Sequence, residues 1–327
     1  MCCLFGFVDY KGAMSKAEKD RLVRILSIEC ELRGTDATGV AYYQGKNLHI
    51  VKKPKAARDI RFSIPANVRA VMGHTRMATQ GEPEKNYNNH PFEGKLPDGH
   101  KFAFAHNGVL YNEDDLRLQY DLPDTKIQTD SYVVAQALES IGHVDFDSLG
   151  EVSQEVLGSF CFTTLTPDNA LHIVKGDNPM CLYDLTKKGV FIYASTRAIL
   201  DAAMKRLGMG SVKKREIVLT DGQIIKISLN GQTEFGEFEM PEDPMWYGGY
   251  YAKTPAVYSY DYDDGYAEYY ENLVEFAERL GFTEDDISYL RHIGYTLEDI
   301  EDYLYEAHPR QGRYYECESA DLVPMYM

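Results

Sequence analysis

Strand-like and helix-like segments alternate along this chain without a regular order. Short runs of β-forming residues, each close to turn residues, cover residues 48–52, 69–74, 101–106 and 189–194. Helical segments are predicted over residues 15–33, 131–141, 149–157 and 198–207. A doubly wound parallel sheet needs a steady strand–helix–strand rhythm, so this irregular order disfavours it.

Two local patterns support this interpretation. In residues 15–33, Leu22, Leu26 and Cys30 recur at helical spacing, and Gly34 follows where a glycine would end the helix. Residues 216–232 predict a hairpin around Asp221-Gly222, with a further turn at Asn230-Gly231. Hairpins join antiparallel strands, so we expect an α+β fold built from layers.

Composition narrows the class of protein. The chain has 327 residues, of which 44 % are hydrophobic, enough to bury a core without stabilising disulfides or metal ions. We expect a cytoplasmic protein, because the N-terminus lacks secretion-signal features and no apolar run approaches the roughly 20 residues of a membrane span. Its six cysteines include no CxxC pair and predict neither a disulfide framework nor structural zinc.

Negative charge is concentrated at the C-terminal end. Residues 239–327 hold 21 acidic and 5 basic residues, whereas residues 1–238 hold 30 and 29. No basic stripe is present, so binding to nucleic acid or to an anionic membrane is disfavoured. Because the Tyr-rich, Pro-rich and Gly-rich sequence after residue 239 lacks periodicity, we predict two parts: a body over 1–238 and an acidic linker plus helical module over 239–327.

The helical module carries a short internal repeat. A helix around residues 269–280 is followed by two segments in which Thr283 and Asp286, then Thr296 and Asp299, form capping-box patterns. Capping boxes mark helix starts and say nothing of function. The module is therefore either a docking surface for a partner or a cap that packs on the body.

The first residues of the chain carry a thiol at a special position. Cys2 is small enough to become the N-terminal residue when methionine aminopeptidase removes Met1, which places a thiol and a free α-amine on one residue. An α-amine has a pKa of about 7.7–8.0, so it can act as the base that activates its own thiol at neutral pH. Cys2 is the predicted nucleophile, and Cys3 cannot share this role because only one α-amine is exposed.

Polar islands interrupt or end the apolar strands downstream of Cys2. They are RGTDATGVA (33–41), GHTRMATQG (73–81), NNHPF (88–92), HNG (106–108) and QTDS (128–131). In this order after an N-terminal cysteine, they resemble the motifs of the class II glutamine amidotransferases, a family of N-terminal-nucleophile amide hydrolases. The resemblance covers residues 2 to about 230 and implies a four-layer αββα sandwich of two antiparallel sheets.

The same residues suit the hydrolysis of a glutamine amide. Asn107 and Gly108 in the His-Asn-Gly turn are predicted to donate hydrogen bonds to the oxyanion that forms when Cys2 attacks the amide carbon. Arg76 suits the substrate α-carboxylate and Asp130 its α-ammonium, roles that the resemblance also implies. Thr79 is expected to line the pocket.

No cofactor and no metal are predicted. His74, His90 and His106 lack metal-ligand spacing and are interpreted as structural hydrogen-bonding residues. The sequence also departs from the family pattern. Cys3 replaces a glycine, while Met77 and Gln80 replace the tryptophan and histidine of the sugar-phosphate branch, so assignment to that branch is disfavoured.

The acceptor of the ammonia is not evident from the sequence. No pyrophosphate loop, Walker motif or phosphoribosyl-binding run is found, and the acceptor is therefore expected to be another polypeptide or water. Three hypotheses follow: a glutaminase that delivers ammonia to a synthase docked on the acidic module, a free-standing hydrolase of a larger γ-glutamyl amide, and a non-catalytic interaction protein that retains the fold.

Overall fold

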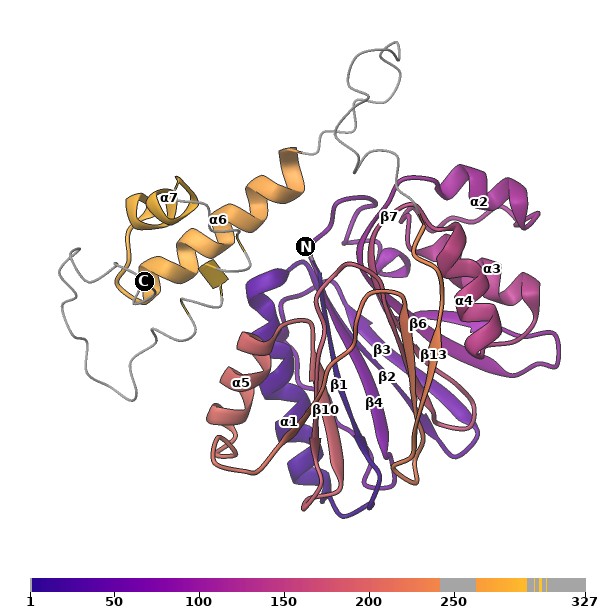
Figure 1. The fold of residues 1–327 in the computed structure, drawn as a ribbon, viewed down its shortest axis with the longest axis horizontal. Coiled ribbons are helices and arrows are strands. Elements are labelled where there is room, and N and C mark those ends of the chain that lie inside the picture. Colours follow the sequence, from indigo (N-terminus) through magenta and orange to yellow (C-terminus); the bar gives the residue numbers. More distant parts are fainter. Residues whose placement is uncertain (1, 242–262, 293–296, 298–299, 302–303, 305–327) are drawn as a thin grey trace, which may run out of the picture. The chain divides into compact units, whose positions relative to one another are not determined.

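Two antiparallel sheets lie face to face between layers of helices in the first part of the chain (Figure 1). The structure is a computed structural model that describes residues 2–241, 263–292, 297, 300, 301 and 304. It divides into two units, Met1–Asp261 and Tyr262–Met327. The boundary predicted between residues 238 and 239 remains a prediction.

The first sheet has seven strands. In spatial order they are β11 (Arg215–Ile217), β9 (Cys181–Leu185), β10 (Val190–Ala194), β1 (Cys3–Asp9), β4 (Ala70–Arg76), β2 (Ala37–Gln44) and β3 (Asn47–Lys53). Every neighbouring pair is antiparallel. The N-terminal strand β1 therefore lies in the middle of the sheet, paired on both edges.

The second sheet has six strands, also antiparallel throughout. In spatial order they are β13 (Thr233–Glu237), β12 (Gln223–Ile227), β8 (Leu171–Lys175), β7 (Gly158–Leu165), β6 (Lys101–Leu110) and β5 (Phe92–Lys95). The predicted four-layer αββα sandwich is confirmed.

Helices cover the outer face of each sheet. On the first sheet α1 (Lys16–Glu29) and α5 (Arg197–Arg206) pack on each other and on β1 and β10. On the second, α3 (Tyr132–Ile141) packs on β5, and α4 (Phe146–Glu155) packs on β12 and β13. A further helix, α2 (Glu113–Gln119), packs on α3 and was not predicted.

Alternation along β1 explains its complete burial. Leu4 and Val8 pack in the core between the two sheets, with Met72 and Ile173. Residues one position away point to the opposite face of a strand, so Phe5 faces the layer of α1. Burial of each such side chain contributes about 1.5–3 kcal/mol to folding, which is why this strand reads as continuously apolar.

The helix predicted over residues 15–33 is present as α1 followed by a 3₁₀ turn, Cys30–Arg33. Ser15 caps it in a reciprocal capping box with Glu18. Gly34 ends this helical segment as predicted, and its amide donates to the Glu31 carbonyl at 3.1 Å, although its φ of 163° is extended and not left-handed. A Cβ at Gly34 would lie 2.4 Å from the carbonyl carbon of Arg76, so the glycine permits a close approach of two chain segments.

The hairpin predicted around Asp221-Gly222 is also wrong. β11 pairs with β9 in the first sheet, whereas β12 pairs with β8 and β13 in the second, so the residues between them cross from one sheet to the other. Pairing with β8 buries Ile224 and Ile225, which a local hairpin with β11 would not achieve. The turn at Asn230-Gly231 is confirmed as the β12–β13 connection.

The second unit contains α6 (Asp263–Arg279) and α7 (Glu284–His292). The capping box before α7 is confirmed, because the Thr283 amide donates to Asp286 Oδ2 at 2.7 Å and the Asp286 amide donates to Thr283 Oγ1 at 3.3 Å. Thr296 and Asp299 lie outside the described residues. Among the helices that the structure describes, none has both the length and the apolar character needed to cross a membrane.

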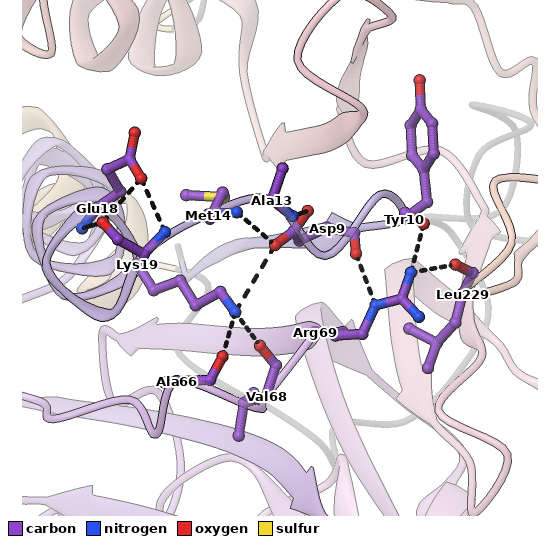
Figure 2. Close-up of polar contacts among 11 residues, drawn as sticks. Asp9, Tyr10, Ala13, Met14, Glu18, Lys19, Ala66, Val68, Arg69 and Leu229 are labelled. Carbon is purple, nitrogen blue, oxygen red and sulfur yellow. Dashed lines mark hydrogen bonds and ion pairs between the residues drawn. The ribbon is translucent and has the colours of Figure 1, made fainter.

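Lys19 is a buried cation that joins α1 to the first sheet (Figure 2). Its Nζ atom donates to the carbonyl oxygens of Val68 at 2.6 Å and Ala66 at 2.8 Å, and lies 3.6 Å from Asp9 Oδ2. Asp9 is fully buried and also accepts a hydrogen bond from the Met14 amide at 3.0 Å. Removing the lysine leaves a buried carboxylate without its cation.

We expect Lys19→Met to lower the free energy of unfolding by about 3–5 kcal/mol, measured by urea denaturation, because one partner of a buried ion pair is lost. Lys16→Met is the matched control on the same helix, since Lys16 and its partner Asp20 are both partly exposed. The control should change the stability by less than about 1 kcal/mol. Equal effects of the two substitutions would contradict this prediction.

Candidate active site

Cys2 lies directly before β1 and is 9 % exposed. Its thiol donates to the Met77 carbonyl at 3.5 Å, and its own carbonyl accepts from Arg33 Nε at 3.2 Å. Burial raises the pKa of the Cys2 thiol above its ordinary value. The thiol is therefore protonated at neutral pH, and a base must take its proton before it can attack a carbonyl carbon.

The two adjacent cysteines occupy different faces of the first sheet. Cys3 Sγ lies 2.9 Å from Cys30 Sγ at the end of α1, on the helix-covered face. By strand alternation Cys2 shares the face of Leu4, which looks toward the second sheet. This separation explains how a cysteine can replace the glycine of the family pattern at position 3 without sharing the space of the candidate nucleophile.

Asn107 and Gly108 lie within β6, in the sheet that faces Cys2, so the predicted His-Asn-Gly turn is wrong: these residues pair with β7 as part of a strand. The side chain of Asn107 is fully buried, and neither its Nδ2 nor its Oδ1 atom has a hydrogen-bond partner among the described residues. A buried amide without partners costs about 1–3 kcal/mol, so such groups are uncommon in a fold and point to a site that is completed by a ligand. Nδ2 is a free donor where the sequence predicts the oxyanion hole.

Strand register brings these elements to one level of the sandwich. Leu4 pairs with His74 across β1 and β4, and His74 Nε2 donates to the His106 carbonyl of β6 at 2.9 Å. The start of β1 and the His-Asn-Gly segment are thus linked across the two sheets by a single histidine side chain. This link connects the two segments on which the sequence places the nucleophile and the oxyanion hole.

Arg76 ends β4 and is nearly completely buried. It donates from Nη1 to Asn89 Oδ1 at 2.7 Å and from Nη2 to the carbonyls of Gly81, at 2.9 Å, and Gln80. Within the described part of the chain these bonds use three of the five guanidinium N–H groups and leave two for a ligand. The structure shows that Arg76 holds the loop after β4, and its role toward a substrate carboxylate stays a prediction.

The RGTDATGVA segment supports the same loop. The Asp36 carboxylate accepts from the Ala78 amide at 2.7 Å, and the Asp36 amide donates to the Arg76 carbonyl at 3.0 Å. Thr79 is exposed within this loop, so its predicted place in a pocket lining stays a prediction.

Asp130 lies before α3 and is buried. Its carboxylate accepts hydrogen bonds from the amides of Leu110 and Ser131, at 2.7 and 2.8 Å, and forms no ion pair with another described residue. After burial, the charges that act on the Cys2 thiol include Arg76, which lowers its pKa, and Asp130, which raises it. The predicted carboxylate clamp and ammonium clamp are thus both close enough to the thiol to influence it.

The three histidines near the site are neutral. Burial lowers the pKa of His74 to about 3 and also lowers the pKa values of His90 and His106. The rings of His74 and His90 pack with their centroids 4.2 Å apart and their planes tilted by 32°, and the Nδ1 atom of His106 lies 2.8 Å from the Ser131 hydroxyl. In the described part of the chain, no group of three or more His, Cys, Asp or Glu residues has a metal-binding arrangement.

Sequence reasoning missed two asparagines that support the site. Asn89 accepts from Arg76, and Asn178 Nδ2 donates to the Asn107 carbonyl at 2.9 Å. Asn89 lies within a motif that was identified, but Asn178 lies in a Gly-Asp-Asn-Pro turn between β8 and β9, far along the chain. The only signal for Asn178 in the sequence is a polar turn that follows an apolar strand. Such a signal does not show which other strand the turn contacts.

The two-sheet sandwich between helical layers, with a cysteine directly before its central strand, is the arrangement that the resemblance to the N-terminal-nucleophile hydrolases predicted. Residues 30–140 match the family model described as "Glutamine amidotransferases class-II". This match confirms, over residues 30–140, the resemblance to the class II glutamine amidotransferases, a family of enzymes.

Curated relatives agree with this assignment. Glutamine–fructose-6-phosphate aminotransferase (isomerizing) of Bacillus subtilis is 28 % identical over 240 residues, covering 71 % of this chain and 38 % of the relative. The protein of the same name from Clostridium perfringens is 28 % identical over 256 residues, covering 76 % and 38 %. This chain therefore spans little more than a third of the length of these relatives.

Solved structures share the fold. Glutamine phosphoribosylpyrophosphate amidotransferase of Bacillus subtilis aligns with a TM-score of 0.58 and 19 % identity, covering 73 % of this chain and 50 % of that chain. A structure described as the allosteric regulatory enzyme of purine biosynthesis aligns with a TM-score of 0.57, at 19 % identity, covering 73 % and 49 %. At this identity the likeness concerns the fold alone.

Proposed function

We propose that this protein hydrolyses the side-chain amide of glutamine to glutamate and ammonia through a cysteinyl thioester, and passes the ammonia to an acceptor enzyme in trans. The observation that carries the proposal is the buried side-chain amide of Asn107, in the sheet that faces the Cys2 thiol, which has no hydrogen-bond partner among the described residues. An oxyanion that binds at this point accepts a hydrogen bond from the unpaired donor, which stabilises the oxyanion.

The proposed reaction uses groups of this chain alone. Once Met1 is removed, the α-amine of Cys2 takes the thiol proton, and Sγ attacks the amide carbon. Asn107 Nδ2 and the Gly108 amide donate to the oxyanion of the tetrahedral intermediate. The C–N bond then breaks as the nitrogen takes the proton back from the α-amine, which releases ammonia and leaves a thioester. Water, deprotonated by the same amine, cleaves the thioester to glutamate and restores the thiol.

Recognition of free glutamine is assigned to two charged groups. The two unused N–H groups of Arg76 suit the α-carboxylate, and Asp130, which has no cationic partner among the described residues, suits the α-ammonium. The acidic segment from residue 239 is kept as the proposed docking region for the acceptor, because its charge sets it apart from the body.

A substitution at Asp130 tests the substrate assignment. In Asp130→Asn, we expect the preference for glutamine over glutaramate, the analogue without an α-amine, to fall roughly 10- to 100-fold in kcat/KM. A charge-assisted hydrogen bond contributes about 1.5–3 kcal/mol, and this bond is made only with glutamine. Rates of ammonia release from each substrate give the ratio, and Asp124→Asn, at an exposed position, serves as the control.

Two outcomes would count against the proposal. An equal loss of activity on glutamine and glutaramate would show that Asp130 acts only by bonding Leu110 and Ser131, and not by binding the substrate. Faster turnover of bulky γ-glutamyl amides than of glutamine would show that a larger γ-glutamyl amide, and not glutamine, is the substrate. A wild-type protein that releases no glutamate from glutamine, alone or with candidate acceptors, would overturn the proposed activity.

A further inference from the structure

We propose that Asn178 is a positioning residue that orients the backbone donor of the oxyanion hole. The inference rests on the proposed function and extends it to a residue outside the motifs of the N-terminal half. Asn178 lies in the turn between β8 and β9 and is 8 % exposed. Its side-chain Nδ2 atom donates to the carbonyl oxygen of Asn107 at 2.9 Å.

The peptide bond between Asn107 and Gly108 connects this contact to the chemistry. The carbonyl of Asn107 and the N–H of Gly108 belong to one planar trans unit, in which they point in opposite directions. The single cis peptide bond in the described residues is His90-Pro91. Asn178 holds the Asn107 carbonyl oxygen so that it points toward the β8–β9 turn. The Gly108 N–H of the same peptide unit must then point away from that turn.

Gly108 needs such a restraint more than another residue would. Its φ is 143°, a conformation that only glycine adopts readily, and glycine has little intrinsic preference for it over other conformations. A Cβ atom at this position would lie 1.9 Å from the Ser159 carbonyl oxygen and 2.7 Å from Asn178 Nδ2, so no side chain can be accommodated to stiffen it. If the peptide flipped, it would present an oxygen instead of an N–H to the oxyanion.

The turn that carries Asn178 is itself anchored on β7. The Asn178 amide donates to the Phe160 carbonyl at 3.3 Å, and the Phe160 amide donates to Asp177 Oδ1 at 2.7 Å. Since β7 pairs with β6 at Phe160 and Gly108, the restraint is built on the neighbouring strand. These two hydrogen bonds to β7 fix the backbone of the turn at Asn178. The Asn178 side chain, held in this way, restrains the Asn107 peptide through its hydrogen bond to the Asn107 carbonyl.

The first test measures catalysis. Asn178→Asp keeps the size of the side chain but replaces its donor by a carboxylate. We expect kcat for glutamine to fall roughly 10- to 100-fold, because a displaced donor stabilises the transition state less. KM should change by less than about twofold, because the substrate carboxylate and ammonium clamps are untouched. Asn112→Asp is the matched control, since Asn112 Nδ2 donates at 2.8 Å to a different backbone carbonyl, that of Glu155.

The second test observes the peptide directly and needs no substrate. The sequence contains only two Asn-Gly pairs, Asn107-Gly108 and Asn230-Gly231. Labelling asparagine carbonyls with ¹³C and glycine amides with ¹⁵N therefore gives two signals in a carbonyl–amide correlation spectrum. We expect Asn178→Asp to shift the 107–108 signal and not the 230–231 signal, and Asn112→Asp to shift neither.

The two tests separate the inference from the proposed function. If the wild-type protein releases no glutamate, the proposed function fails, whereas the position of the 107–108 signal still decides the role of Asn178. An unmoved signal, a kcat equal to that of the Asn112→Asp control, or a rise in KM with unchanged kcat would each overturn the inference. Asn178→Ala removes the donor without adding charge and replaces the aspartate variant if the latter does not fold.

Discussion

Cys2→Ala is expected to abolish the release of glutamate from glutamine, with kcat reduced by roughly 10⁴-fold or more. Neither the oxyanion donors nor the charged clamps can replace a nucleophile that forms a covalent bond to the substrate. Glutamine should still bind, because the proposed clamps Arg76 and Asp130 remain in place. Glutamate release gives the rate, calorimetry gives the binding, and the intact mass of the wild type should show that Met1 is absent.

The neighbouring thiol provides the control for this experiment. Cys3→Ala should retain most of the activity, because the Cys3 thiol contacts Cys30 on the opposite face of the strand. Activity that survives in Cys2→Ala and disappears in Cys3→Ala would exchange the two assignments. An active wild-type protein that retains Met1 would rule out the α-amine of Cys2 as the base.

Asn107→Ala is expected to reduce kcat by about 10²- to 10³-fold with little change in KM, the effect of removing one oxyanion donor. The same substitution should not lower the free energy of unfolding, because the Asn107 amide has no hydrogen bond to lose in the described fold. Steady-state kinetics and thermal denaturation measure the two effects separately. A loss of activity without a loss of stability is the result that identifies a functional group.

Asn88 offers a contrasting case of equal burial. Its side chain donates to the Glu82 carbonyl at 3.1 Å and accepts from the Gln128 amide at 2.9 Å. Asn88→Ala should lower the free energy of unfolding by about 1–3 kcal/mol, because it leaves these groups without partners. If Asn107→Ala destabilised the protein as strongly, Asn107 would be a structural residue and not an oxyanion donor.

The layered fold could be predicted because strand and helix periodicity are local properties of a sequence. The helices predicted over residues 131–141 and 198–207 are present as α3 and α5 within one residue at each end. The predicted hairpin failed because β-forming residues on both sides of Asp221-Gly222 indicate two strands but not which sheet each one joins. That choice was decided by the pairing of β12 with β8, some fifty residues earlier in the chain.

The candidate site was predictable where its residues fall in compact motifs and not where they act through tertiary contacts. Asn107 and Asp130 were identified from their polar settings between apolar strands. The loop-holding bonds of Arg76 depend on how residues 80, 81 and 89 fold around its guanidinium, and no sequence pattern shows this. Asn178 matters through one hydrogen bond to a backbone oxygen about seventy positions away.

The central place of β1 in its sheet sets an order of events during synthesis. Phe5 pairs with Gly73 on one edge and with Ala194 on the other, so the strand is not enclosed until about 194 residues have been made. At 5–20 residues per second this takes roughly 10 to 40 s. The removal of Met1 that the proposed function requires is therefore expected during translation, before folding buries Cys2.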